Sequence, residues 1–146
     1  MKSHDVFQEE LQRIVRENPS QKVFDYIEEN IMCFFSTPFI SDYYQILKDT
    51  DMSISEKILP KLVKAWLAFL SGDNAGLNSI MKNIDELALK GSHESSFYYA
   101  LKALTGLSSS LQEKLKYAKL SVDILPEGDC SIFMANAKLT YAQILA

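Results

Sequence analysis

The side chains best suited to catalysis or metal binding are few in this sequence and lie far apart. Two histidines, His4 and His93, and two cysteines, Cys33 and Cys130, are the candidate nucleophiles and metal ligands. Zinc and redox sites need such residues in closely spaced sets, and none of the four has a partner at that spacing. We therefore expect no catalytic residue, no metal site and no cofactor.

Carboxylate pairs are the next candidates for chemistry. Glu9-Glu10, Glu28-Glu29 and Asp85-Glu86 all fall on helical patterns, where charges belong on the solvent-exposed face. A general acid and base need a pocket and shifted pKa values, and a sequence pattern indicates neither. The chain also has no phosphate-binding glycine loop and no nucleophile elbow. The sequence predicts a protein that is not an enzyme, with an enzyme or its regulatory subunit as a rival interpretation.

A row of aromatic and polar side chains is a better candidate for a functional site. Tyr98 and Tyr99 are neighbours on a predicted helix, so they point about 100° apart and one of them must face outward. Helical spacing from Tyr99 leads to Lys102, and the repeat described below adds Asn136 and Gln143. These four residues are the predicted binding groove for a protein, a peptide or a small effector. The same row also fits an ordinary solvated helix face.

The charge of the chain opposes a nucleic-acid surface. Its net charge is −4 and its pI is near 5.2, whereas phosphate binding relies on clustered Lys and Arg. The most basic stretch, Lys114 to Lys119, fits one exposed helix face. No run approaches the roughly 20 apolar residues that cross a bilayer, and the polar N-terminus does not resemble a secretory signal. With two unpaired cysteines, these features predict a cytoplasmic protein that binds neither nucleic acid directly nor a membrane.

These side chains must be positioned by helices, because apolar residues recur at helical spacing and no useful strand-like alternation occurs. The expected helices cover 5–17, about 19–37, about 39–49, 60–70, about 74–89, 94–108, about 111–125 and about 130–146. Their expected boundaries are Asn18-Pro19, Thr37-Pro38, a Ser53–Glu56 capping box, Gly72 with Asp73, Gly91, a Ser110–Glu113 capping box, and the turn at 125–129. Residues expected to face inward include Leu70, Leu87, Ala88, Leu107 and Leu111.

The helical pattern returns after 37 residues. Met134, Ala137 and Tyr141 repeat the spacing of Phe97, Ala100 and Leu104, and the turn beginning at Leu70 corresponds to one beginning at Leu107. Two-helix repeats of about 34 to 47 residues are typical of tetratricopeptide-like solenoids. We therefore predict an all-α fold, a TPR-like superhelix of antiparallel helical hairpins, whose function is binding.

The organisation along the chain follows from this repeat. Residues 59–146 carry the regular hairpins, whereas residues 1–58 are less regular and are expected to form an N-terminal helical cap within one structural domain. The chain stops within a helix that is still apolar. We expect a fragment of a longer chain, or self-association through the C-terminal helix.

Two segments resemble a known family. PKLVKAWLAFLSGDNAGLNSIM (60–81) and EKLKYAKLSVDILPEGDCSIFMANAKLTYAQIL (113–145) are similar to hairpins in the helical-repeat domain of MalT-like, LuxR-type transcription regulators. The shared features are a Pro-x-Leu helix start, an Ala-Trp pair, Gly-Asp turns and an Ala-rich helix. The resemblance covers about residues 20–146, and it implies a role in effector sensing, partner binding or self-association.

The chain also departs from that family. It has no P-loop for an ATPase and no basic helix-turn-helix. Lys114 and Ser121 occupy positions where a strict tetratricopeptide hairpin has alanine. The expectation is a protein-interaction or effector-sensing module of such a regulator, without its own ATPase or DNA-binding site. The alternative is a stand-alone TPR-like adaptor protein that is not involved in transcription.

Overall fold

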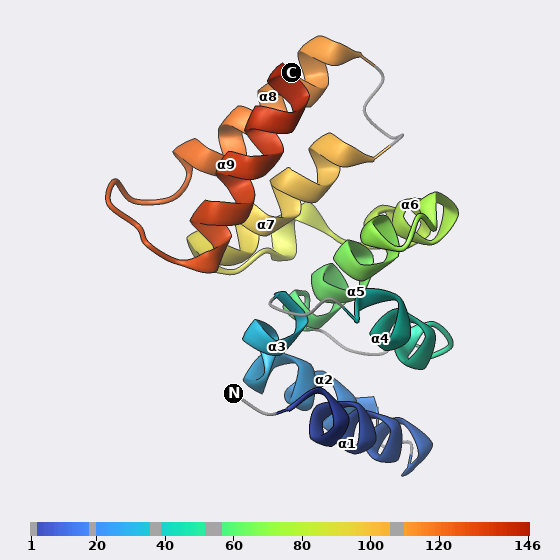
Figure 1. The fold of residues 1–146 in the computed structure, drawn as a ribbon. Coiled ribbons are helices and arrows are strands. Elements are labelled where there is room, and N and C mark those ends of the chain that lie inside the picture. The colour runs from blue at the N-terminus through green and yellow to red at the C-terminus, as the bar shows by residue number, and fades with distance from the viewer. Residues whose placement is uncertain (1–2, 18–19, 36–38, 52–56, 106–109) are drawn as a thin grey trace. The chain divides into compact units, whose positions relative to one another are not determined.

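The computed structural model describes residues 3–17, 20–35, 39–51, 57–105 and 110–146 (Figure 1). Within these ranges the chain is all-α and contains no strand, so the predicted fold class is confirmed at that level. The elements are α1 (His4–Glu17), α2 (Ser20–Glu29), α3 (Ile31–Phe35), α4 (Ile40–Leu47), α5 (Leu59–Leu70), α6 (Asn74–Lys82), the 3-10 turn η1 (Glu86–Ala88), α7 (Gly91–Leu104), α8 (Leu111–Asp123) and α9 (Ile132–Leu145). None of these helices is both long and apolar enough to cross a bilayer.

Some predictions fall outside this part of the chain. They are the breaks at Asn18-Pro19 and Thr37-Pro38, the Ser53–Glu56 capping box, and the turn that begins at Leu107. Packing divides the chain into two compact units, Met1–Gly76 and Leu77–Ala146. The sequence-based division at 58/59 marks the start of repeat character and stays a prediction.

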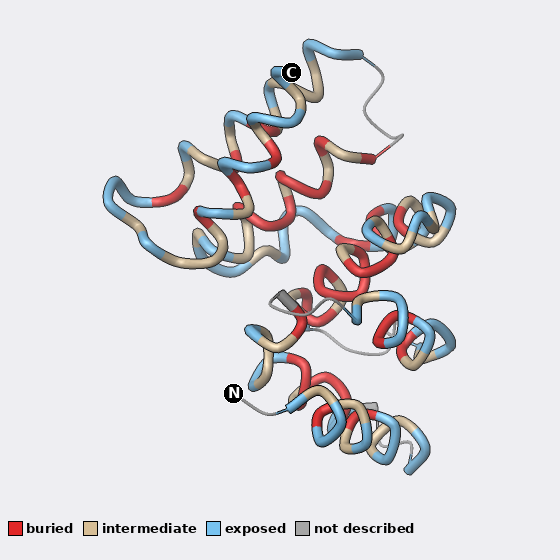
Figure 2. Tube along the Cα trace, in the orientation of Figure 1, coloured by how far each residue is buried: buried red, intermediate tan, exposed pale blue. Residues whose placement is uncertain are grey.

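An aromatic cluster forms the centre of the first unit. The Phe7 ring of α1 lies edge-on to Phe34 and Tyr43, with ring centroids 5.0 and 4.9 Å away, and it stacks on Tyr26 at 5.6 Å. Such arrangements are worth about 0.5–1.5 kcal/mol per pair beyond area burial. Because these rings come from four helices, they fix α1 to α4 around one core (Figure 2).

The α5–α6 junction forms as its sequence predicts. Gly72 has a φ of 81°, a conformation that L side chains rarely adopt, and Asp73 then caps α6 by accepting the Gly76 backbone N–H at 2.9 Å. The Tyr44 hydroxyl donates to the other oxygen of Asp73 at 2.5 Å. Burial, followed by this bond, raises the pKa of Tyr44 to about 12. The cap of α6 is therefore fastened to α4.

The second unit is built on three helices that pack on one another. Each pair among α7, α8 and α9 is in contact, and each helix buries one alanine completely: Ala100, Ala118 and Ala137. The Ser96 hydroxyl of α7 donates to the backbone carbonyl of Ser121 at 2.6 Å, and the Ser121 hydroxyl donates to the Ala118 carbonyl at 2.6 Å. Ser121 is therefore fully buried with its hydroxyl and its carbonyl both hydrogen-bonded.

Three pairs of side chains that lie 37 residues apart are buried to a similar extent. Phe97 and Met134 are buried, Ala100 and Ala137 are fully buried, and Leu104 and Tyr141 are half-buried. These three pairs of positions therefore have similar burial, whereas Leu101 is fully buried and Lys138, 37 residues later, is exposed.

The prediction that Leu70, Leu111, Leu87 and Ala88 face inward is wrong. Leu70 lies at the end of α5 and Leu111 in the first turn of α8, and both side chains are exposed. The helix predicted over 74–89 ends at Lys82, because Asp85 accepts the Leu87 N–H at 2.9 Å and starts η1 instead. As a result, Leu87 is 94% exposed and Ala88 is also exposed.

Replacing Gly76 should destabilise the first unit. A Cβ at this position would lie 2.5 Å from Asp73 Oδ2 and 2.7 Å from the Tyr44 hydroxyl. Such crowding costs about 1–3 kcal/mol, which outweighs the roughly 1 kcal/mol that alanine gains over glycine in a helix. Urea denaturation should give a lower free energy of unfolding for Gly76→Ala than for wild type. Ser79→Ala, at an exposed position of α6, is the control. The loss should shrink in a Tyr44→Phe background, and an equal loss in both backgrounds would contradict this account.

Candidate functional site

Two of the predicted binding residues meet at a carboxylate. The Tyr99 hydroxyl donates to Glu86 Oε1 at 2.6 Å, and Lys102 Nζ lies 3.5 Å from Glu86 Oε2. Tyr99 and Lys102 are one turn apart on α7, whereas Glu86 belongs to η1. The cluster therefore fastens η1 to α7.

A tyrosine of α8 completes this cluster. The Tyr117 ring stacks on Tyr99 with a centroid distance of 6.1 Å and an interplanar angle of 5°, and Lys102 Nζ lies 4.5 Å from the Tyr117 centroid. Tyr98 is buried while Tyr99 is half-exposed, which confirms that only one of the neighbouring tyrosines faces outward. We name Glu86, Tyr99, Lys102 and Tyr117 the tyrosine–lysine cluster.

The electrostatics of the tyrosine–lysine cluster favour a structural role over a catalytic one. The bond from Tyr99 and the charge of Lys102 lower the pKa of Glu86, and the same bond, with burial, raises the pKa of Tyr99 to about 12. At neutral pH the carboxylate is therefore charged and the phenol neutral. A general base would need the opposite shift of its carboxyl pKa.

The other two predicted binding residues lie on α9. Asn136 is half-buried and Gln143 is exposed, and they share one face because they are seven residues apart. A common binding role for Tyr99, Lys102, Asn136 and Gln143 stays a prediction.

A groove that the sequence did not reveal runs between α8 and α9. Its volume is about 290 Å³, and its lining includes Lys119, Val122 and Asp123 from α8 and Lys138, Tyr141 and Leu145 from α9. The available signal was α9 itself, which is apolar around much of its circumference. A helix of that kind usually has neighbours on more than one side, yet Leu139 and Leu145 remain 60% and 59% exposed.

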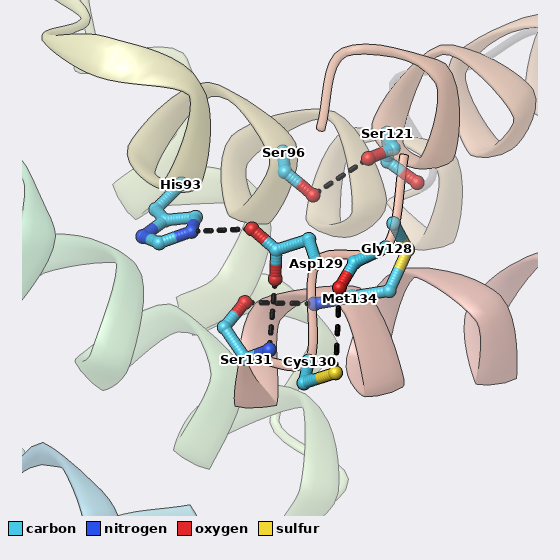
Figure 3. Close-up of polar contacts among 8 residues, drawn as sticks. All are labelled: His93, Ser96, Ser121, Gly128, Asp129, Cys130, Ser131 and Met134. Atoms are coloured by element: carbon cyan, nitrogen blue, oxygen red, sulfur yellow. Dashed lines mark hydrogen bonds and ion pairs between the residues drawn. The ribbon is translucent and has the colours of Figure 1, made fainter. Parts of the chain in front are cut away.

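The turn between α8 and α9 is held to the start of α7 (Figure 3). His93 Nε2 donates to Asp129 Oδ2 at 2.9 Å, and the His93 ring stacks on Phe133 at 5.0 Å. Asp129 Oδ1 accepts the Ser131 N–H at 2.8 Å, and the Ser131 hydroxyl in turn caps α9 by accepting the Met134 N–H. These bonds set where α9 begins, and therefore where the groove lies.

The two cysteines are not joined to each other, and His4 lies against an aromatic ring. Both thiols are free, with Cys33 half-buried and Cys130 exposed, and Cys130 Sγ donates to the Gly128 carbonyl at 3.3 Å (Figure 3). His4 stacks on Phe39 at a centroid distance of 3.5 Å. Within the described part of the chain, no group of three or more His, Cys, Asp or Glu side chains is arranged to hold a metal ion.

The Asp129 contacts should make the second unit sensitive to acid. Hydrogen bonds from Ser131 and His93 lower the pKa of Asp129 to about 2, from an ordinary value of 3.8. A lowered pKa stabilises the fold above the unfolded value and loses that stability as the pH falls between about 4 and 2. As the pH is lowered across this range, the melting temperature should fall less steeply for Asp129→Asn than for wild type. Asp123→Asn is the matched control, and parallel curves for wild type and Asp129→Asn would refute the role of Asp129.

The tyrosine–lysine cluster should control local opening of η1. Tyr99→Phe and Lys102→Met each remove one contact to Glu86, so the Leu87, Ala88 and Leu89 amides should exchange with deuterium faster. Global stability should change by less than about 1 kcal/mol, because the contacts are partly exposed. Lys82→Met, at the exposed end of α6, is the control. Unchanged exchange in both variants would show that η1 is held by other contacts.

Comparison with known proteins gives no relative for this chain: no family model, no curated protein and no solved structure matches it. Its function is therefore inferred from its own side chains. Two features of the second unit are candidates for a functional site, and they differ in whether their polar groups already have partners. The tyrosine–lysine cluster is satisfied internally, whereas the α8–α9 groove presents apolar and charged groups to solvent.

Proposed function

We propose that this chain is a protein-interaction module built from helical hairpins, with α9 and the α8–α9 groove as its binding surface. The observation that carries the proposal is the pair of exposed leucines on α9, Leu139 and Leu145. Single exposed apolar side chains are ordinary, but here Leu145 lines a groove together with Val122 and Tyr141, and Leu139 lies on α9 outside that lining. Grouped apolar side chains beside a concave surface are typical of binding sites.

The packing of the second unit supports the same proposal. Helix α9 is capped by Ser131, packs on both α7 and α8, and buries Ala137 fully. Its outward side chains are therefore presented by a fixed backbone. A surface held in this way loses little conformational entropy when a partner binds.

The setting we propose is the helical-repeat sensor of a MalT-like, LuxR-type regulator. The support is the two resembling segments at 60–81 and 113–145, together with the Gly-Asp turns at Gly72-Asp73 and Gly128-Asp129. In such a setting the module would bind a protein partner or a small effector and change regulation through altered contacts. A stand-alone adaptor is the alternative with the same binding surface.

Site-specific crosslinking tests the proposed binding surface. A photoreactive amino acid in place of Leu139 should capture a partner protein in the cells that make this chain. The same group in place of Gln45, which is exposed on α4, should not capture that partner. Mass spectrometry identifies the product, and Leu145→Asp should abolish its formation because it places a charge in the apolar contact.

The outcomes separate the proposals. A partner with a nucleotide-hydrolysing or DNA-binding domain would support the regulator setting, and a partner of another kind would favour the adaptor. Equal capture at positions 139 and 45, or no capture at either, would contradict α9 as a binding surface.

A further inference from the structure

We propose that the α8–α9 groove binds an acidic amphipathic α-helix of a partner protein. This inference rests on the proposed function of the second unit as an interaction surface, and it specifies the chemistry of the partner. It is drawn from the shape of the groove, from its lining and from the charges on its two sides.

The shape of the groove fits a helix. Helices α8 and α9 lie side by side (Figure 1) and are in contact. Two packed helices leave a furrow that a third helix can fill, and within this unit the pair α7 and α8 already receives α9 in that manner. The volume of about 290 Å³ is at the lower end for small-molecule pockets. It suits a few side-chain anchors of a helix better than a large cofactor.

The lining of the groove provides apolar anchoring points. Tyr141 and Leu145 stand one turn apart on α9 and face Val122 of α8 across the groove. Ala142 lies between them and is exposed, and Ala135 and Leu139 continue the exposed face of α9. Small residues allow another helix backbone to come close. A helix with apolar residues at i, i+3 or i+4, and i+7 would cover this surface.

The charges predict an acidic partner. Lys119 on α8 and Lys138 on α9 line opposite walls of the groove. Among the described residues, neither lysine is in an ion pair, in contrast to Lys102 at Glu86. The groove lining also contains Asp123, so it carries two lysines against one carboxylate and has an excess of positive charge, although the whole chain has a net charge of −4. Complementary charge steers association and selects partners.

A selection experiment tests this inference without knowledge of the natural partner. The intact chain is used to select from a displayed library of helical peptides of random sequence. The selected peptides should carry apolar residues at helical spacing, flanked by Glu and Asp. Fluorescence anisotropy with a selected peptide should show at least about tenfold weaker binding to the Lys119→Glu/Lys138→Glu variant. The matched control is Lys82→Glu/Lys90→Glu, which reverses two exposed lysines away from the groove.

A second selection, on the Lys119→Glu/Lys138→Glu variant, provides the sharper readout. If the groove is the site, the preference should change from acidic to basic peptides. Leu145→Asp should weaken the acidic peptides independently, and circular dichroism should show that each variant keeps its helical content. Equal binding of the selected peptides to wild type and to the groove variants would overturn the inference, yet leave an interaction module with another surface. Failure of both the selection and the Leu139 crosslink would overturn both proposals.

Other occupants would contradict the inference in recognisable ways. Lysine-dependent binding to vesicles of phosphatidylserine and phosphatidylcholine, without acidic peptides among those selected, would assign the groove to a lipid surface. A concentration-dependent dimer that Leu145→Asp dissociates would assign it to a second copy of the chain. Sedimentation measurements on the intact chain distinguish these results from a peptide-binding monomer.

Discussion

Close approach of the helices through small residues is the constraint on which the second unit depends. Ala100, Ala118 and Ala137 are fully buried, one on each of the three helices. Larger side chains at these points would hold the helix axes apart and separate the contacts that flank them. Ser121 meets the same constraint, because its hydroxyl bonds to the preceding turn and its carbonyl accepts a bond from Ser96. A serine at this position therefore fits the packing of α7 on α8.

The same constraint explains why the groove exists. Helix α9 buries Met134, Ala137 and Thr140. Its other apolar residues lie on the remaining faces of the helix. Because His93 and Ser131 fix the turn before α9, the exposed leucines have a set direction relative to α8. Lys119 and Lys138 then stand on opposite walls of the groove. An apolar surface with charge on both sides is thus a direct consequence of how three helices pack.

Local signals in the sequence predict the all-α class and several helix ends, but few parts of the site. The Asp73 and Ser110 caps depend on neighbouring residues only, and both form as predicted. The end of α6 was missed because apolar spacing continues to Leu87, while the Asp85 side chain competes for the backbone and ends the pattern. Glu86 was assigned to a solvated face, since its bond to Tyr99 depends on tertiary packing. The α8–α9 groove was missed for the same reason: no sequence pattern places Val122 opposite Tyr141.

The two charged features of the second unit differ in whether their charges are already paired. Lys102 lies against Glu86 and over the Tyr117 ring, so a ligand would have to displace contacts that stabilise η1. Within the part of the chain that the structure describes, Lys119 and Lys138 are in no ion pair. They border apolar side chains whose removal from water is favourable. Binding at the groove therefore gains from burial and from charge without first breaking an internal bond. On physical grounds the groove, rather than the predicted Tyr99–Lys102 row, is the stronger candidate for recognition.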